Sequence, residues 1–136
     1  MTLETNPPDV QLTQQPLELI LARNLIASLD IPAFLVDEHE TLVFYNPSAG
    51  ELLGKRFEEL GRRSVTEWGA EQFERDGGPI SPEELPFSVA VREARPVHQR
   101  FGVRPDGGAH IEIEASAVPL VGADTCRGAI IVFWPV

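Results

Sequence analysis

The pattern of apolar and polar segments predicts an α+β fold, in which a five-stranded antiparallel sheet carries its helices on one face. Two short apolar runs, at residues 33–36 and 41–45, are separated by a polar turn and are typical of a hairpin. The last third of the chain alternates apolar and polar side chains around turn residues, which indicates three more strands. Segments with helix-starting prolines lie before the first run and between the two groups of strands.

Length and charge narrow the class of protein. The chain has 136 residues, the size of one domain, and its 43% of apolar residues suffice for one modest core. The net charge of −10 disfavours binding to nucleic-acid phosphates and to anionic membranes. A single cysteine, Cys126, excludes an internal disulfide and fits a reducing compartment. Because residues 1–15 do not resemble a signal peptide and no apolar run could span a bilayer, we expect a cytoplasmic protein.

The first predicted helix runs from Pro16 to Leu29, after a polar tail over residues 1–15 that we expect to be flexible. Pro16 suits the first turn, and Pro32 ends the helical pattern. Apolar side chains cover more of this helix than one core-facing stripe requires; they are Leu17, Leu19, Ile20, Leu21, Ala22, Leu25, Ile26 and Leu29. The helix is therefore expected to contact two apolar partners.

The first hairpin joins strands at Ala33–Val36 and Thr41–Tyr45 through a polar four-residue turn. A short helix follows, because Asn46 can cap free backbone N–H groups and Pro47 suits the first helical position. Gly54 provides a left-handed cap for its end.

The middle of the chain has weaker signals. We expect one more helical turn over residues 55–60, then a charged loop with helical fragments over residues 61–81, anchored by Trp68 and Phe73.

A second long helix is predicted to begin at Ser81, with Pro82 in its first position and Glu84 completing a capping box. We expect it to continue to about Ala94, since Pro86 falls near the first turn, where a missing backbone donor costs less.

The last three strands are predicted at Val97–Arg104, Ala109–Leu120 and Arg127–Trp134. The turn Pro105–Gly108 joins the first two, because proline fixes φ and glycine permits positive φ. Apolar side chains alternate with Glu112, Glu114 and Ser116 along the middle strand; they are Ile111, Ile113, Ala115 and Ala117. The last strand, after a loop over residues 121–126, is apolar on both faces, so both faces must be covered.

The ordered set of these segments, rather than any one motif, resembles the PAS family over residues 31–134. The stretches that carry the resemblance are Ile31–Asp37, Thr41–Ala49, Leu53–Gly54, Pro82–Pro86, Arg104–Gly108, Ala117–Leu120 and Gly128–Phe133. The resemblance implies a PAS domain over residues 31–136 and a flanking helix over residues 16–30. Many PAS domains leave the last strand through an Asp-Ile-Thr-like exit, which is missing here, so a stand-alone protein and a piece of a longer one both stay open.

PAS domains sense small molecules, light or redox state through a pocket between the sheet and the helices. The resemblance implies that this region is faced by Phe34, Val36, Phe101, Ile111, Ile113, Ala115, Ala129, Ile131 and Phe133. Either these side chains fill the core, which we favour, or they line a cavity. A cavity with this lining would take a small apolar or aromatic molecule.

PAS domains also dimerise, often through an N-terminal helix on the outer face of the sheet. The resemblance implies a dimer interface formed by Leu17, Ile20, Leu21, Ile130, Val132 and Trp134. We expect a homodimer that has a signalling protein or effector as a further partner, and neither nucleic acid nor membrane.

The resemblance also bears on cofactors. Haem-binding PAS domains supply a histidine from the helix at residues 82–94, which contains none here. Flavin-binding light sensors of this fold use a helical cysteine, whereas Cys126 lies in a predicted loop. We therefore predict no cofactor, apart from a small apolar ligand if the cavity exists.

The histidines are interpreted as solvated surface residues. With the turn at residues 105–108, His110 would lie opposite about Val103 and His98 opposite about Ala115, too far apart to share a metal.

No catalytic group is predicted. The sequence has no G-x-S-x-G turn, and the alternation turns Glu112 and Glu114 toward solvent. We expect a sensory or protein-interaction module of a bacterial-type regulator in signal transduction. The alternatives are a small-molecule carrier without a signalling partner and, less favoured, a cone-shaped α+β isomerase, which would need a buried ionisable group.

Overall fold

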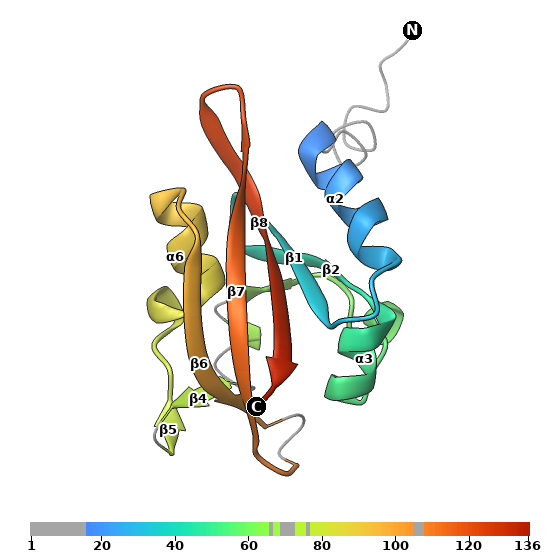
Figure 1. Ribbon diagram of the computed structural model, residues 1–136, viewed down its shortest axis with the longest axis vertical. Coiled ribbons are helices and arrows are strands. Elements are labelled where there is room, and N and C mark those ends of the chain that lie inside the picture. The colour runs from blue at the N-terminus through green and yellow to red at the C-terminus, as the bar shows by residue number, and fades with distance from the viewer. Residues whose placement is uncertain (1–15, 66, 69–72, 76, 105–107) are drawn as a thin grey trace, which may run out of the picture.

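The computed structural model describes residues 16–136 except 66, 69–72, 76 and 105–107, and in this part the strands form one antiparallel sheet (Figure 1). The strand order is β3-β2-β1-β8-β7-β6-β4-β5. The strands are β1 (Ala33–Asp37), β2 (Thr41–Tyr45), β3 (Arg63–Ser64), β4 (Phe73–Arg75), β5 (Gly78–Pro79), β6 (Val97–Val103), β7 (Ile111–Gly122) and β8 (Thr125–Pro135). The five predicted strands are the central ones, and the short β3, β4 and β5 extend the sheet at its edges.

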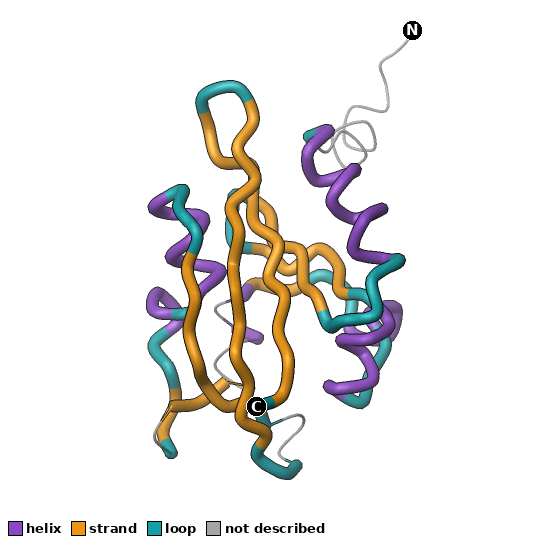
Figure 2. The backbone as a smooth tube through the Cα atoms, in the orientation of Figure 1, coloured by secondary structure: helices purple, strands orange, loops and turns teal. Residues whose placement is uncertain are grey.

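Helices lie on both sides of this sheet, as Figure 2 shows. They are α2 (Leu17–Ala27), α3 (Pro47–Leu53), α4 (Phe57–Leu60), the 3-10 turn η1 (Pro82–Glu84) and α6 (Pro86–Glu93). Helix α6 packs against β6, β7 and β8, whereas α2 packs against β1, β2, β7 and β8 from the other side. None of the helices in the described ranges is long and apolar enough to cross a bilayer.

One apolar cluster lies on each side of the sheet, between it and the helices. Successive residues of β1 belong alternately to the two clusters. Phe34 and Val36 belong to the inner cluster, together with residues of α6. Ala33 and Leu35 belong to the outer cluster, which α2 completes with Leu19, Ala22 and Ile26. Every apolar position of β1 is therefore buried, and the prediction of an α+β sheet with an outer-face helix is confirmed.

The local signals of the first hairpin act as predicted. The Asp37 carboxylate accepts hydrogen bonds from the backbone N–H groups of His39 and Thr41, at 2.9 and 3.0 Å, which closes the turn. Asn46 caps α3, and Gly54 ends it in the left-handed conformation with φ of 77°.

The prediction of a loop with helical fragments over residues 61–81 is wrong in part. Its described residues include the short strands β3, β4 and β5. β3 pairs with β2 and β4 pairs with β6, both distant in the chain, while β5 pairs with β4 in a local hairpin. No periodicity in so short a strand could indicate this pairing. Trp68 and Phe73 are buried, as expected of anchors.

The prediction of a single helix from Ser81 to about Ala94 is also wrong. The Ser81 hydroxyl contacts the Glu83 carboxylate, and a 3-10 turn precedes a new helix that begins at Pro86. Proline has no N–H to donate and its ring crowds the carbonyl four residues earlier, so it starts α6 instead of lying inside a longer helix.

The loop predicted over residues 121–126 is replaced by a continuous hairpin. β7 runs to Gly122 and β8 starts at Thr125, so only Ala123 and Asp124 form the turn, with Ala123 at φ of 52°. Sequence reasoning missed this turn because it lacks the glycine or asparagine that usually signals one.

The register between β6 and β7 differs from the predicted one by one residue. His98 lies opposite Ser116 and Val103 opposite Ile111. Residues 105–107 of the predicted turn and the predicted tail over residues 1–15 lie outside the described residues.

Candidate functional site

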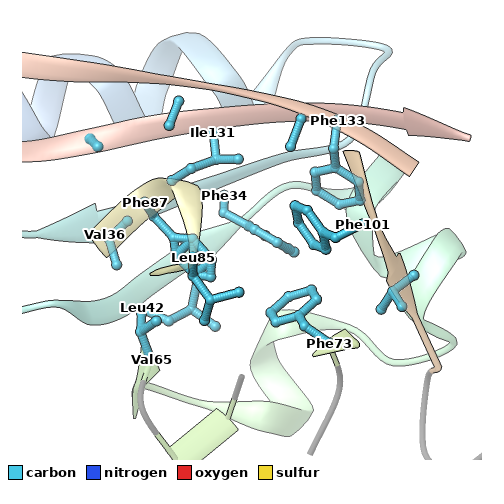
Figure 3. Packing of buried hydrophobic residues seen from close by; sticks show 14 of the residues in the cluster. Phe34, Val36, Leu42, Val65, Phe73, Leu85, Phe87, Phe101, Ile131 and Phe133 are labelled. Carbon is cyan, nitrogen blue, oxygen red and sulfur yellow. The ribbon is translucent and has the colours of Figure 1, made fainter. Parts of the chain in front are cut away.

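The predicted pocket residues come together on the inner face of the sheet (Figure 3). Strands β1, β6, β7 and β8 supply them, because their inward positions alternate with outward ones. Phe34, Val36, Phe101, Ile113, Ala115, Ala129, Ile131 and Phe133 are buried. Ile111 is only half-buried and packs against the cluster from its rim.

Aromatic rings fill much of this inner cluster by contacting one another. The Phe34 ring lies 4.5 Å from Phe133 and 5.1 Å from Trp68, measured between centroids. Phe73 lies 5.2 Å from both Trp68 and Phe101. The Phe34–Phe133 pair is tilted at 38°, and the other three contacts are edge-on. Such ring contacts stabilise a core and support the filled-core interpretation.

Sequence reasoning did not assign Trp68, Phe73 and Phe87 to this cluster, although all three are buried in it. Trp68 and Phe73 lie in a segment without a regular period, where an isolated aromatic residue signals burial but not its direction. Phe87 lies on α6, whereas the residues that the PAS resemblance assigned to the pocket are all on strands.

Polar groups are scarce on the buried side of α6. The Ser88 side chain is 1% exposed, and its hydroxyl has no hydrogen-bond partner among the described residues. The described residues also contain no group of three histidine, cysteine or acidic side chains placed to hold a metal ion. The Tyr45 hydroxyl is a second polar group of the inner cluster, and it donates to the backbone carbonyl of Lys55.

Two of the histidines, His98 on β6 and His110 just before β7, pair with carboxylates. The His98 ring is 2.9 Å from the Glu114 carboxylate, which also accepts a hydrogen bond from Arg100. These two partners lower the pKa of Glu114, His98 most. The third histidine, His39, is exposed in the turn between β1 and β2.

His110 belongs to a separate cluster at the β4 edge. Its ring nitrogens lie 2.9 Å from the Glu112 carboxylate and 3.5 Å from Glu74. The Glu112 contact raises the pKa of His110, while Arg104, bonded to Glu74, lowers the pKa of that carboxyl.

The predicted interface residues separate into two groups on the outer side. Leu17, Ile20 and Leu21 are exposed by 65%, 42% and 58% on the face of α2 that points away from the sheet. Leu25, which sequence reasoning did not include, is exposed by 58% on that same face.

Strand β8 carries the remaining interface residues. Ile130 and Val132 are half-buried and pack against the outer cluster that α2 completes. Trp134 is exposed by 37% and its ring lies 6.0 Å from that of His98. α2 therefore covers part of the sheet's outer face, and none of the described residues covers the outer surface of α2 itself.

Asn46 fixes the end of α2 to this framework. Its side-chain N–H groups donate to the carbonyls of Ile26 and Ile31, both at 2.9 Å. Its side-chain oxygen accepts from the backbone N–H groups of Ala33 and Ala49, at 3.1 and 2.9 Å. The sequence indicated only the cap on α3, because the other partners become neighbours only in the folded chain.

Solved structures with this architecture include PAS domains and LOV proteins. The PAS domain of nitrogen regulation protein NR(II) from Vibrio parahaemolyticus is 11% identical in sequence, with a TM-score of 0.61. The match covers 85% of this chain and 98% of that domain's chain. A PAS domain of a protein from Colwellia psychrerythraea is 16% identical, with a TM-score of 0.65, covering 86% of this chain and 97% of that one.

The Rhodobacter sphaeroides LOV protein is 13% identical in sequence, with a TM-score of 0.69. The match covers 88% of this chain and 67% of the LOV chain. No protein-family model and no curated protein matches the sequence. At identities this low, the likeness shows a shared fold.

Proposed function

Because the chain has the PAS fold, we propose that it is a signalling and protein-interaction module that forms a homodimer through the free face of α2. The observation that carries the proposal is the pair of opposite apolar faces on this one helix. Leu19, Ala22 and Ile26 are buried against the sheet. Leu17, Ile20, Leu21 and Leu25 lie on the other face at helical spacing and are exposed.

The size of this exposed stripe favours a second copy of the chain as its partner. Two copies would bring together four large apolar side chains from each, and full burial of one such side chain stabilises by about 1.5–3 kcal/mol. About half of that gain is available here, since these side chains are 42–65% exposed in the single chain. The sum is comparable with the association cost of about 4–15 kcal/mol, so a symmetric dimer is the simplest arrangement.

The test compares charge insertions on and away from this face. Leu21→Glu would place a carboxylate in the apolar contact, and we expect light scattering to show a monomer where the unmodified chain is a dimer. Val136→Glu makes the same kind of change at a residue that is 61% exposed near the C-terminus, and should leave the dimer intact.

Two further variants locate the interface. Deletion of residues 1–29 should give monomer or aggregate, because the outer cluster would lose α2. Trp134→Glu tests whether the dimer contact extends from α2 onto β8. A dimer that survives both Leu21→Glu and the deletion would rule out the proposal.

A further inference from the structure

A second feature of the outer side is an open pocket of about 180 Å³ beside the C-terminal end of α2. Ala27 of α2 forms one wall, and the rings of Phe44, Tyr45 and Phe57 form the apolar part of the lining. Arg56 and Glu58, next to Phe57 in the chain, are the charged groups of its wall. Tyr45 also belongs to the inner cluster, whereas the exposed stripe of α2 contributes no residue to this pocket.

The aromatic part of the pocket is rigidly packed. The Phe57 ring lies 5.7 Å from that of Phe44 and 5.4 Å from that of Tyr45, with the rings at 65° and 80° to each other. Phe44 and Tyr45 are 8% and 2% exposed, so the apolar walls are held by the sheet and need no rearrangement to receive a ligand. An apolar cavity of about 150 Å³ accommodates benzene, so this volume suits one aromatic ring.

Its charges favour an anion. Among the described residues, no ion pair or side-chain hydrogen bond engages the Arg56 guanidinium. A second cation, Arg23 of α2, lies 4.6 Å from the centre of the Phe44 ring. Glu58 opposes these charges in part. An unpaired guanidinium beside an apolar pocket matches a carboxylate, to which arginine donates two parallel hydrogen bonds.

We propose that this pocket binds a small aromatic carboxylate, with the ring against Phe44 and Phe57 and the carboxylate on Arg56. The ligand would contact both Ala27 of α2 and Phe57 of α4. It would thereby link α2 to α4 close to Asn46. The Asn46 side chain already joins the end of α2 to α3 through hydrogen bonds with Ile26 and Ala49. The site does not depend on the proposed dimer.

The test uses benzoate as the probe and ¹⁵N–¹H chemical shifts of the full chain as the readout. We expect benzoate to shift the amide signals of Ala27 and Phe57 at millimolar concentration. Arg56→Gln should weaken benzoate about five- to tenfold while leaving the neutral analogue benzyl alcohol unaffected. Glu58→Gln should strengthen benzoate, because it removes the opposing charge. Ala27→Leu should abolish binding of both compounds by filling the pocket.

The control is Arg95→Gln. Arg95 follows α6 and pairs with Glu93, the last residue of that helix, and α6 lies on the other side of the sheet from α2. All of these positions are exposed, so the variants should fold. Equal weakening by Arg56→Gln and Arg95→Gln would mean non-specific charge attraction, and no shift at Ala27 and Phe57 would leave no site; either result overturns the proposal.

Discussion

At the scale of single residues, Asn46 illustrates how one buried amide can define the relation between elements. Both of its N–H groups and both acceptor positions of its oxygen are used, by groups of α2, the residues before β1, β1 itself and α3. Its side chain is fully buried, so each of these partners would be left without water if the amide were lost.

We therefore expect Asn46→Ala to lower the free energy of unfolding by about 2–4 kcal/mol. Hydrogen exchange should show faster exchange of the α2 amides, since the end of that helix loses its tether. Ser48→Ala is the matched control, because the Ser48 hydroxyl also donates to a backbone carbonyl, that of Asp30, at an exposed site. Equal losses in the two variants would show that Asn46 contributes nothing beyond an ordinary cap.

At the scale of elements, the close approach of β8 to β1 depends on Gly128. This residue pairs with Asp37 and has φ of 153°, a conformation that residues with side chains rarely adopt. A Cβ atom here would overlap the backbone carbonyl of Val36. The two strands can pair along their length only because this position has no side chain.

Gly128→Ala should accordingly destabilise the chain by about 3 kcal/mol or more, from backbone strain and overlap together. Gly54 also has a positive φ but open space around it, so Gly54→Ala should cost only about 1–2 kcal/mol. Urea unfolding of both variants measures the difference. Similar losses would mean that β8 can shift away from β1 at little cost.

Helix α6 shows the same dependence on neighbours at the element scale. Capping residues at 81–84 indicated a helix start, and a tight turn does form there. Pro86 then determines where the α-helix begins, since it cannot donate within a preceding turn. Its buried residues, among them Phe87 and Ala90, follow directly from this start.

At the scale of the whole molecule, ion pairs on the sheet surface shape the response to pH. Glu112 and Glu74 raise the pKa of His110, so its contribution to stability is complete below its ordinary value of 6.5 and is lost as pH rises through the raised value. Glu74 and Glu114 have lowered pKa values, and their contribution is lost as pH falls below their ordinary value of 4.5.

Stability should therefore be greatest between about pH 4.5 and 6.5 and should decline as pH rises above that range. His110→Gln should flatten the decline on the alkaline side, and Glu112→Gln should flatten it in part by removing the main partner of the ring. Chemical unfolding across this pH range provides the measurement. A slope that neither variant changes would place the pH dependence elsewhere in the molecule.

What the sequence by itself determined is the set of locally encoded elements. The first hairpin, the cap at Asn46, the left-handed end at Gly54 and the alternation along β7 follow from residues a few positions apart. Their signals are turn chemistry and side-chain period, which act within one segment. These local elements, taken in order, were enough to indicate the PAS fold.

The tertiary structure alone decided which distant segments meet. Residues far apart in the chain form the pairing of β3 with β2 and of β4 with β6, and they provide the second role of Asn46. The ring contacts of Trp68 with Phe34 and of Phe73 with Phe101 are long-range as well. The aromatic pocket beside Arg56 exists only where α2, β2 and α4 come together. Burial and hydrogen bonding stabilise contacts between groups that are close in space, whatever their separation in the chain. A sequence pattern indicates only which residues are close along the chain.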